Sequence, residues 1–113
     1  MLALLYGLKS IAPAALQALQ PGRVAVFDMN GRHRWAQAHV PGARSLGPDF
    51  TRADLPTDPA TPLVFYCSNP LCRKAPGAGR RAKQMGFADV AVMSAGIAGW
   101  QSAGLPTEAG APA

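Results

Sequence analysis

The stretch FYCSNPLCRKAP, residues 65–76, contains both cysteines of the chain, Cys67 and Cys72. Cys67 ends an apolar run, and Arg73 and Lys74 follow Cys72 directly. The thiolate is the reactive form of cysteine, and nearby cations or a helix N-terminus lower the thiol pKa from about 8.5. The residue types and their spacing therefore allow four roles for Cys67: nucleophile, disulfide partner, metal ligand or buried apolar residue.

The predicted elements around the cysteines place Cys67 at a sheet edge. The run PLVFYC, residues 62–67, predicts a buried strand, and residues 74–85 predict a helix that Gly86 stops. DVAVM, residues 89–93, predicts the next strand and completes a β-α-β crossover. Ligands of such sheets bind beyond the carboxyl ends of the strands. Cys67 is expected at that end.

The remaining segments also alternate between strand and helix patterns. They predict a helix over 11–20 capped by Ser10, a strand over 23–28, a short helix over 32–38, a brief strand at 44–46, a proline-rich loop over 47–62 and a short helix within 94–104. The fold class is therefore α/β, with a small, mostly parallel sheet of four to five strands flanked by helices. The length of 113 residues favours one domain over 1–113, with a core of about 10–108.

The composition indicates a folded, soluble protein. A hydrophobic content of 49% and a charged content of 15% are typical of a globular chain. Two cysteines are too few for a disulfide-stapled secreted scaffold. The opening MLALLYGLK is too short to span a bilayer and lacks a cleavage site. We expect no membrane association and a cytoplasmic location, where cysteines stay reduced.

The charge balance is basic, with 11 Lys and Arg against 6 Asp and Glu, a net charge of +5. Five cations lie close to Cys72 in the sequence: Arg73, Lys74, Arg80, Arg81 and Lys83. Nucleic acid is not the expected partner, because no aromatic residues interleave with these cations as a base-stacking platform requires. The cluster indicates either a solvated helix face or a field that attracts small anions toward Cys67.

The loop between the predicted strand and helix has the makings of an anion-binding cradle. The backbone N–H groups of Ser68, Asn69, Leu71 and Cys72 have no strand partners, and they can point inward if the loop curls around the sulfur. Arg73 adds formal charge, whereas Pro70 in this loop has no N–H group. These residues are therefore the candidates for substrate binding.

Metal and protease-like alternatives have weaker support. Zinc could use His33, His39, Cys67 and Cys72, but no C-x-x-C pattern is present, so we expect neither a metal nor a cofactor. A Cys–His catalytic pair with either histidine has no other support in so short a chain. A buried, inert Cys67 remains an alternative, because free cysteine is often buried.

Several motifs resemble the rhodanese-like sulfurtransferase family, over roughly residues 10–108. VAVFDMN resembles the family's first core strand, AHVPGA its Gly-His-Ile-Pro-Gly-Ala turn and VFYC the strand before its active-site cysteine. GFADVAVMSAGIAGWQSAGLP, residues 86–106, resembles its closing segment. The resemblance implies that Cys67 is catalytic and carries sulfane sulfur as a persulfide. It also implies a small anionic sulfur donor, such as thiosulfate, and a thiol, cyanide or protein acceptor.

The chain departs from the family pattern at three places. Asn30 stands where arginine usually follows Asp28, and Ala38 replaces the glycine before His39. The loop is also longer: CSNPLCR places five residues between Cys67 and Arg73. That spacing is similar to dual-specificity phosphatases and arsenate reductases, where arginine binds the oxyanion that the cysteine attacks. Oxyanion chemistry, or a non-catalytic redox or interaction domain, therefore remains the alternative.

Cys72 has two interpretations. A curled loop can bring its Cα within about 7 Å of that of Cys67, the limit for a disulfide. Cys72 is then a candidate resolving thiol, which attacks the persulfide and leaves a Cys67–Cys72 disulfide. The alternative is a small apolar residue at the start of a helix.

Overall fold

The computed structural model of the protein describes residues 7–110. Its strands form one parallel sheet with the order β1-β5-β4-β2-β3. They are β1 (Lys9–Ser10), β2 (Ala25–Asp28), β3 (Arg44–Ser45), β4 (Leu63–Tyr66) and β5 (Val90–Val92). The α/β class and the parallel sheet are therefore confirmed. β4 is the central strand, so its carboxyl end lies at the middle of the sheet edge.

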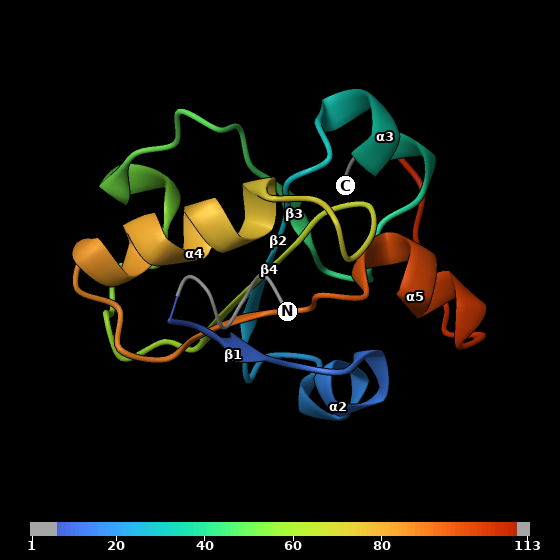
Figure 1. Ribbon diagram of the computed structural model, residues 1–113, viewed down its shortest axis with the longest axis horizontal. Coiled ribbons are helices and arrows are strands. Elements are labelled where there is room, and N and C mark those ends of the chain that lie inside the picture. Colours follow the sequence, from blue (N-terminus) through green and yellow to red (C-terminus); the bar gives the residue numbers. More distant parts are fainter. Residues whose placement is uncertain (1–6, 111–113) are drawn as a thin grey trace.

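Helices cover both faces of the sheet (Figure 1). They are α2 (Pro13–Leu19), α3 (Arg32–Gln37), α4 (Lys74–Gln84) and α5 (Gly96–Ser102), with a 3₁₀ turn, η1 (Arg52–Asp54). α4 packs against β4 and β5, whereas α2 and α5 contact each other on the opposite side. α3 lies at the upper edge in Figure 1, beyond the end of β2. The fold therefore has three layers, with the sheet between two layers of helices.

The residues of β4 alternate between two hydrophobic clusters because successive side chains of a strand point to opposite faces. Leu63 and Phe65 belong to the α4-side cluster, and Cys67 continues this alternation. Val64 and Tyr66 belong to the opposite cluster, which includes Trp100 of α5. The side chain of Cys67 is therefore directed to the α4 side of the sheet.

Small residues allow α4 to lie close to the sheet. Ala75, Ala78 and Ala82 are buried in the α4-side cluster. A Cβ added at Gly79 would lie 2.8 Å from Leu8 Cδ1, too close for an ordinary contact. The close packing holds the start of α4, and with it the end of the cysteine loop, near β4.

The first helix begins later than the sequence predicts. Ser10 was expected to cap it, but Ser10 lies in β1 opposite Val92, and its hydroxyl is 3.0 Å from that of Ser94. Ala12 is the N-cap residue and Pro13 the first helical residue. The assignment of Ser10 as a cap is wrong because pairing with β5 holds its backbone in the sheet.

The segment 47–62 is mostly loop, as predicted, with η1 as its one regular turn among the described residues. The apolar opening of the chain, residues 1–6, lies outside the described residues. Within 7–110, no helix is both long enough and apolar enough to cross a membrane.

Candidate active site

Cys67 directly follows β4 and begins the loop that leads into α4. Its carbonyl oxygen accepts a hydrogen bond of 2.9 Å from the N–H of Ile97, and that of Ser68 accepts one of 3.1 Å from Ala98. Gly96 makes this contact possible: its φ is +67°, and a Cβ there would lie 2.6 Å from the backbone C and O of Ser68. The start of α5 therefore holds the backbone of the cysteine loop.

The two cysteines are bonded to each other. Cys67 and Cys72 form a disulfide with a Cα–Cα distance of 6.3 Å, within the limit expected from the sequence. The side chain of Cys72 packs against the same cluster that contains Cys67, and Cys67 is only 3% exposed. The structure is thus that of the oxidised loop, and the role of Cys72 as a resolving thiol stays a prediction.

The backbone donors of the predicted cradle are partly used inside the loop. The N–H of Leu71 donates to Asn69 Oδ1 at 2.9 Å, and that of Cys72 donates to the Asn69 carbonyl at 3.1 Å. The Leu71 side chain is 85% exposed, and Arg73 is exposed at the N-cap of α4. The cavity beside the two cysteines holds only about 10 Å³. In the disulfide form these donors face Asn69, so an anion would need the loop to rearrange.

Side chains from the end of β2 fix the residues on both sides of Cys67. The Tyr66 hydroxyl donates to Asp28 Oδ2 at 2.6 Å and accepts a 3.0 Å hydrogen bond from the N–H of Val40. Ser68 Oγ donates to Asn30 Oδ1 at 2.7 Å. Asn30, which stands where the family usually has arginine, thus joins the end of β2 to the cysteine loop.

Burial governs the ionisation of the Asp28–Tyr66 pair. Desolvation raises the pKa of Asp28 above its ordinary value of 3.8, although hydrogen bonds from Tyr66 and from the N–H of Asn30 lower it. Desolvation and the neighbouring Asp28 carboxylate raise the pKa of Tyr66, which keeps the phenol protonated. Tyr66 can therefore act as a hydrogen-bond donor but not as a base.

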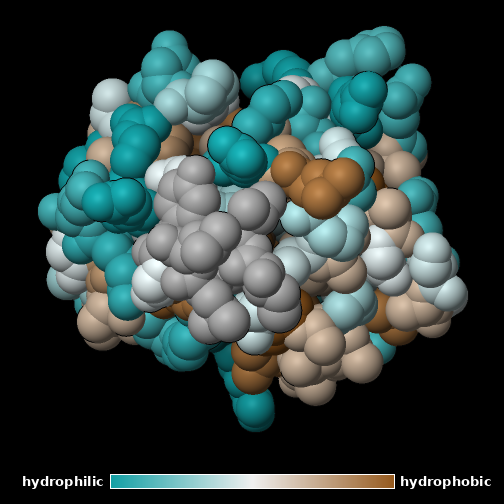
Figure 2. Space-filling model, in the orientation of Figure 1, coloured by the Kyte–Doolittle hydropathy of each residue, from teal (hydrophilic) through white to brown (hydrophobic). Residues whose placement is uncertain are grey.

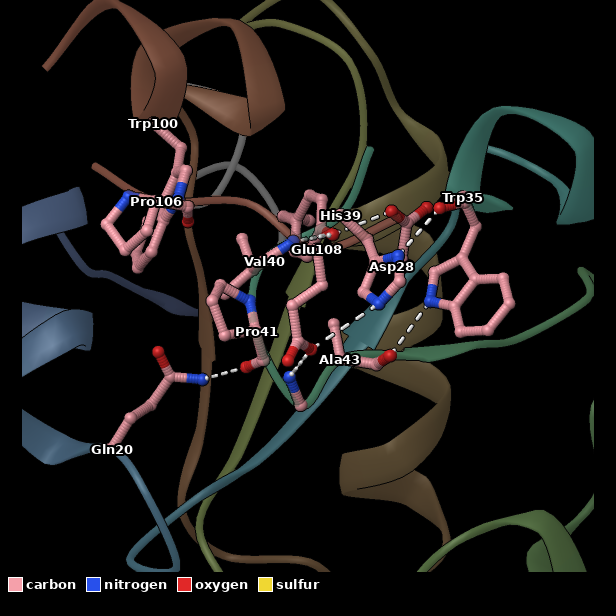
Figure 3. A network of polar contacts seen from close by, with 12 residues as sticks. Gln20, Asp28, Trp35, His39, Val40, Pro41, Ala43, Trp100, Pro106 and Glu108 are labelled. Atoms are coloured by element: carbon pink, nitrogen blue, oxygen red, sulfur yellow. Dashed lines mark hydrogen bonds and ion pairs between the residues drawn. The ribbon is translucent and has the colours of Figure 1, made fainter. Parts of the chain in front are cut away.

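His39 is held by Trp35 of α3 and by Glu108 of the carboxy-terminal segment (Figure 3). Its ring is 3% exposed, stacks on Trp35 with centroids 4.3 Å apart, and has Nδ1 2.7 Å from the Trp35 carbonyl. Its Nε2 lies 3.7 Å from Glu108 Oε1, whose other contact is with the N–H of Gly42. Among the described residues, no three or more His, Cys, Asp and Glu side chains gather as metal ligands would.

Exposed cations gather near the carboxyl edge of the sheet. Arg32, Arg34, Arg73 and Lys74 are exposed, and Figure 2 shows hydrophilic side chains along the upper edge, where Figure 1 places α3. Arg81 instead contacts Phe50. Its guanidinium donates to the Phe50 carbonyl at 2.6 Å and lies 4.2 Å from the centroid of the Phe50 ring. The predicted cation cluster therefore divides, and Arg81 holds the 47–50 loop.

Sequence reasoning missed the contacts that support the loop. Asp28 and Tyr66 are direct neighbours in the parallel pairing of β2 and β4, and their shared position at the strand ends was a signal that could have found the pair. The contacts of Ser68 with Asn30 and of the loop with Gly96 depend on how α5 and the loop pack. No local pattern marks them.

Comparison with known proteins identifies the family to which this chain belongs. The family model of the rhodanese-like domain matches residues 12–103. The chain belongs to the rhodanese-like domain family. The predicted resemblance is thus confirmed, and the β2 and β4 ends, the cysteine loop and the start of α5 all lie within the matched residues.

One curated relative of this rhodanese-like domain is a longer protein. The chain is 31% identical over 99 residues to the HTH-type transcriptional regulator Rv0324 of Mycobacterium tuberculosis, covering 86% of this chain and 43% of that protein. It therefore spans less than half the length of that curated relative.

Two solved structures share the fold of this domain. Thiosulfate sulfurtransferase from Pseudomonas aeruginosa has a TM-score of 0.81 at 22% identity, covering 97% of this chain and 22% of that one. A protein of unknown function from Rhodopseudomonas palustris, described as a possible tyrosine phosphatase, has a TM-score of 0.72 at 23% identity, covering 95% and 91%.

Proposed function

We propose that this rhodanese-like domain is a sulfurtransferase that carries sulfane sulfur on Cys67. The observation that carries the proposal is the place of Cys67 at the carboxyl end of the central strand, with its carbonyl held by Ile97 at 2.9 Å and its neighbours fixed by Asp28 and Asn30. This is the position at which parallel sheets bind ligands.

The reaction balances as two displacements at sulfur. The Cys67 thiolate attacks the outer sulfur of a donor such as thiosulfate, the S–S bond of the donor breaks, and sulfite leaves with the electron pair. A thiolate or cyanide acceptor then attacks the outer sulfur of the persulfide and releases the Cys67 thiolate. Because the Cys67–Cys72 disulfide occupies the nucleophile, a thiol reductant must first cleave it.

Mass spectrometry of the reduced protein after thiosulfate treatment tests the proposal. We expect the mass of one added sulfur atom on the peptide that contains Cys67, and its loss on addition of cyanide with formation of thiocyanate. The variant Cys67→Ser should fold but carry no added sulfur. Normal turnover by that variant would refute the assignment of Cys67.

Oxyanion chemistry is the second candidate, favoured by the Cys-x₅-Arg spacing of Cys67 and Arg73. A phosphoryl transition state spreads charge over three oxygens and needs a fixed cation, whereas transfer of neutral sulfur needs less compensation. Arg73→Ala should therefore weaken thiosulfate use only modestly. Hydrolysis of phenyl phosphate or reduction of arsenate by the wild type, with a loss of several orders of magnitude in Arg73→Ala, would favour this candidate instead.

A further inference from the structure

A pocket lies along the edge of the sheet at the start of β2. Its volume is about 380 Å³, and four consecutive residues, Val24–Phe27, line it together with Gly42 and Arg44. Because successive side chains of a strand point to opposite faces, a pocket on one face meets only every second residue. A pocket that four consecutive residues line therefore lies against the backbone edge of β2, on the side of β3.

β3 is too short to cover this edge of β2. It pairs with Phe27 and Asp28, and within residues 7–110 no strand pairs with Ala25 or Val26 on that side. On the other side, β4 pairs with all four residues of β2. The first half of β2 is therefore an unpaired strand edge, and such edges accept a further strand from another chain.

The N–H group of Val26 points toward this open edge. The N–H of Ala25 donates to the Pro62 carbonyl, on the β4 side, at 2.9 Å, and successive residues of a strand direct their N–H groups to opposite sides. The N–H of Val26 therefore points away from β4, and no residue of the described chain accepts it. Val26 is only 4% exposed. Because buried N–H groups without an acceptor are rare, this donor is left for a water molecule or a ligand.

Arg44 places a positive charge where the open edge ends. It is exposed and lines the pocket, and neither ion pair found among residues 7–110 engages it. Because its backbone belongs to β3, a segment added beside Ala25 cannot continue past it in the sheet. The added segment therefore ends or turns away at Arg44, and the guanidinium favours a carboxylate end over an ammonium end.

The remaining wall of the pocket is mostly apolar and comes from residues 53–56. A residue paired opposite Ala25 directs its side chain to the face on which Ala25 packs, the α4 side. Leu55 is buried in the same α4-side cluster, so an apolar side chain fits beside it. Asp54 is the acidic residue of the lining, and its carboxylate already accepts a 2.8 Å hydrogen bond from the N–H of Thr51.

We infer that this edge binds the free carboxyl-terminal segment of a partner peptide or protein, extended and parallel to β2. The terminal carboxylate accepts the hydrogen bond from the N–H of Val26 and pairs with Arg44, and an apolar last side chain packs beside Leu55. Strand addition at a sheet edge and capture of a terminal carboxylate are both established forms of peptide recognition. Neither cysteine lines the pocket, so this site is separate from the chemistry proposed for Cys67.

Calorimetry with a matched pair of peptides tests the inference. The probes are acetyl-Gly-Ser-Gly-Leu with a free carboxylate and the same peptide as its carboxyl-terminal amide. Because the loss of a charge-assisted hydrogen-bonded pair weakens binding by about tenfold or more, we expect the amide to bind wild type more weakly by that factor. Equal affinities for the two peptides, or no binding of the acid, would overturn the inference.

Arg44→Ala should reduce the affinity for the acid to about that for the amide and leave the affinity for the amide unchanged. Arg80→Ala is the matched control, because Arg80 is another exposed cation that does not line the pocket. It lowers the net charge equally and should bind both peptides as wild type does. Equal losses of acid binding in the two variants would refute the role of Arg44. Sodium acetate that binds as tightly as the acid would refute strand addition.

Amide hydrogen exchange followed by NMR locates the bound peptide. In the free protein the N–H of Val26 should exchange faster than that of Ala25, because only the N–H of Ala25 has a carbonyl acceptor. Saturation with the acid should slow exchange at Val26 several-fold and leave exchange at Ala25 unchanged. Unchanged exchange at Val26 while the acid is bound would locate the peptide elsewhere and overturn the inference.

Discussion

Cys67 is fixed through its neighbours rather than through contacts of its own sulfur with polar groups. The residue before it is tied to Asp28 and the residue after it to Asn30, by hydrogen bonds of 2.6 and 2.7 Å. Its carbonyl is held by Ile97. With three successive residues fixed, the direction of the Cys67 side chain is set by the backbone, which is the preorganisation that a displacement at sulfur requires. Cys72 lies in the part of the loop that these contacts leave free.

The role of Cys72 as a resolving thiol can be tested by following the release of the outer sulfur atom of the Cys67 persulfide. In the proposed step its thiolate attacks Sγ of the Cys67 persulfide, the bond to the outer sulfur breaks, hydrosulfide leaves, and a dithiol reductant later restores both thiols. Loaded wild type kept without oxygen should lose its persulfide, releasing one sulfide for each 67–72 disulfide. Cys72→Ser should keep the persulfide, as non-reducing peptide mapping would show.

Direct oxidation of the two thiols would give a different ratio of released sulfide to Cys67–Cys72 disulfide. Air or peroxide forms the disulfide without releasing sulfide, so the ratio of sulfide to linked peptide distinguishes the two routes. Cys67→Ser controls for sulfide released from free thiosulfate. Equal persulfide lifetimes in wild type and Cys72→Ser would leave Cys72 as a packing residue.

At the scale of elements, the junction between β5 and α5 supports the cysteine loop through close backbone contact. Gly96→Ala should force Ser68 away, because the new Cβ would lie 2.6 Å from its backbone. The left-handed φ of +67° adds a cost of about 1–2 kcal/mol. We expect lower stability in urea unfolding and, independently, slower sulfur transfer.

The variant Gly104→Ala separates the effect of backbone strain from the effect of steric contact with the cysteine loop. Gly104 also has a left-handed φ, +75°, but a Cβ there meets nothing within 4 Å. This variant should lose about the same 1–2 kcal/mol from strain and keep the transfer rate of wild type. Equal transfer rates in the two variants would contradict a role for Gly96 in holding the loop.

The pairing of β2 with β4 buries a titratable group, the carboxyl of Asp28. Because burial raises the pKa of Asp28 above 3.8, the folded state binds its proton more tightly than the unfolded state. The free energy of unfolding therefore contains a contribution that falls as pH rises from about 3.8 through the folded pKa. Asp28→Asn lacks this contribution, so its stability relative to wild type should increase between pH 3 and pH 7.

Urea unfolding of both proteins across that range measures the effect. Asp49→Asn, which removes an exposed carboxylate, controls for the loss of one surface charge. A relative stability of Asp28→Asn that decreases toward neutral pH would show instead that the hydrogen bonds from Tyr66 and Asn30 outweigh burial.

For the whole molecule, the sequence predicts regular elements better than it predicts their contacts. The strand at residues 63–66 follows from an apolar run, and the end of the helix over residues 74–84 follows from Gly86. Both signals are local. The two residues of β1 are too few to form a pattern, and Ser10 is misassigned for that reason. The positions of Asn30, Arg34 and Glu108 depend on how distant segments pack, which no local rule gives.

The overall charge should act on anions that approach the site. The net charge is +5, and Arg32, Arg34, Arg73 and Lys74 are exposed near the sheet edge that Cys67 occupies. Such a field raises the encounter rate of anions and weakens with salt, because the screening length falls to about 3 Å at 1 M. Neutral reagents should not respond.

Iodoacetate and iodoacetamide form a matched pair of probes, since they alkylate the same thiolate and differ in charge. In reduced Cys72→Ser, the rate of Cys67 alkylation by iodoacetate should fall several-fold between about 0.01 and 1 M salt, over which range the screening length shortens about tenfold. The iodoacetamide rate should stay nearly constant, which excludes a salt effect on the thiolate itself. Removing both Arg73 and Lys74 by alanine substitution should flatten the iodoacetate dependence. Equal salt dependence for the two reagents would show that the cations at this edge do not steer anions to Cys67.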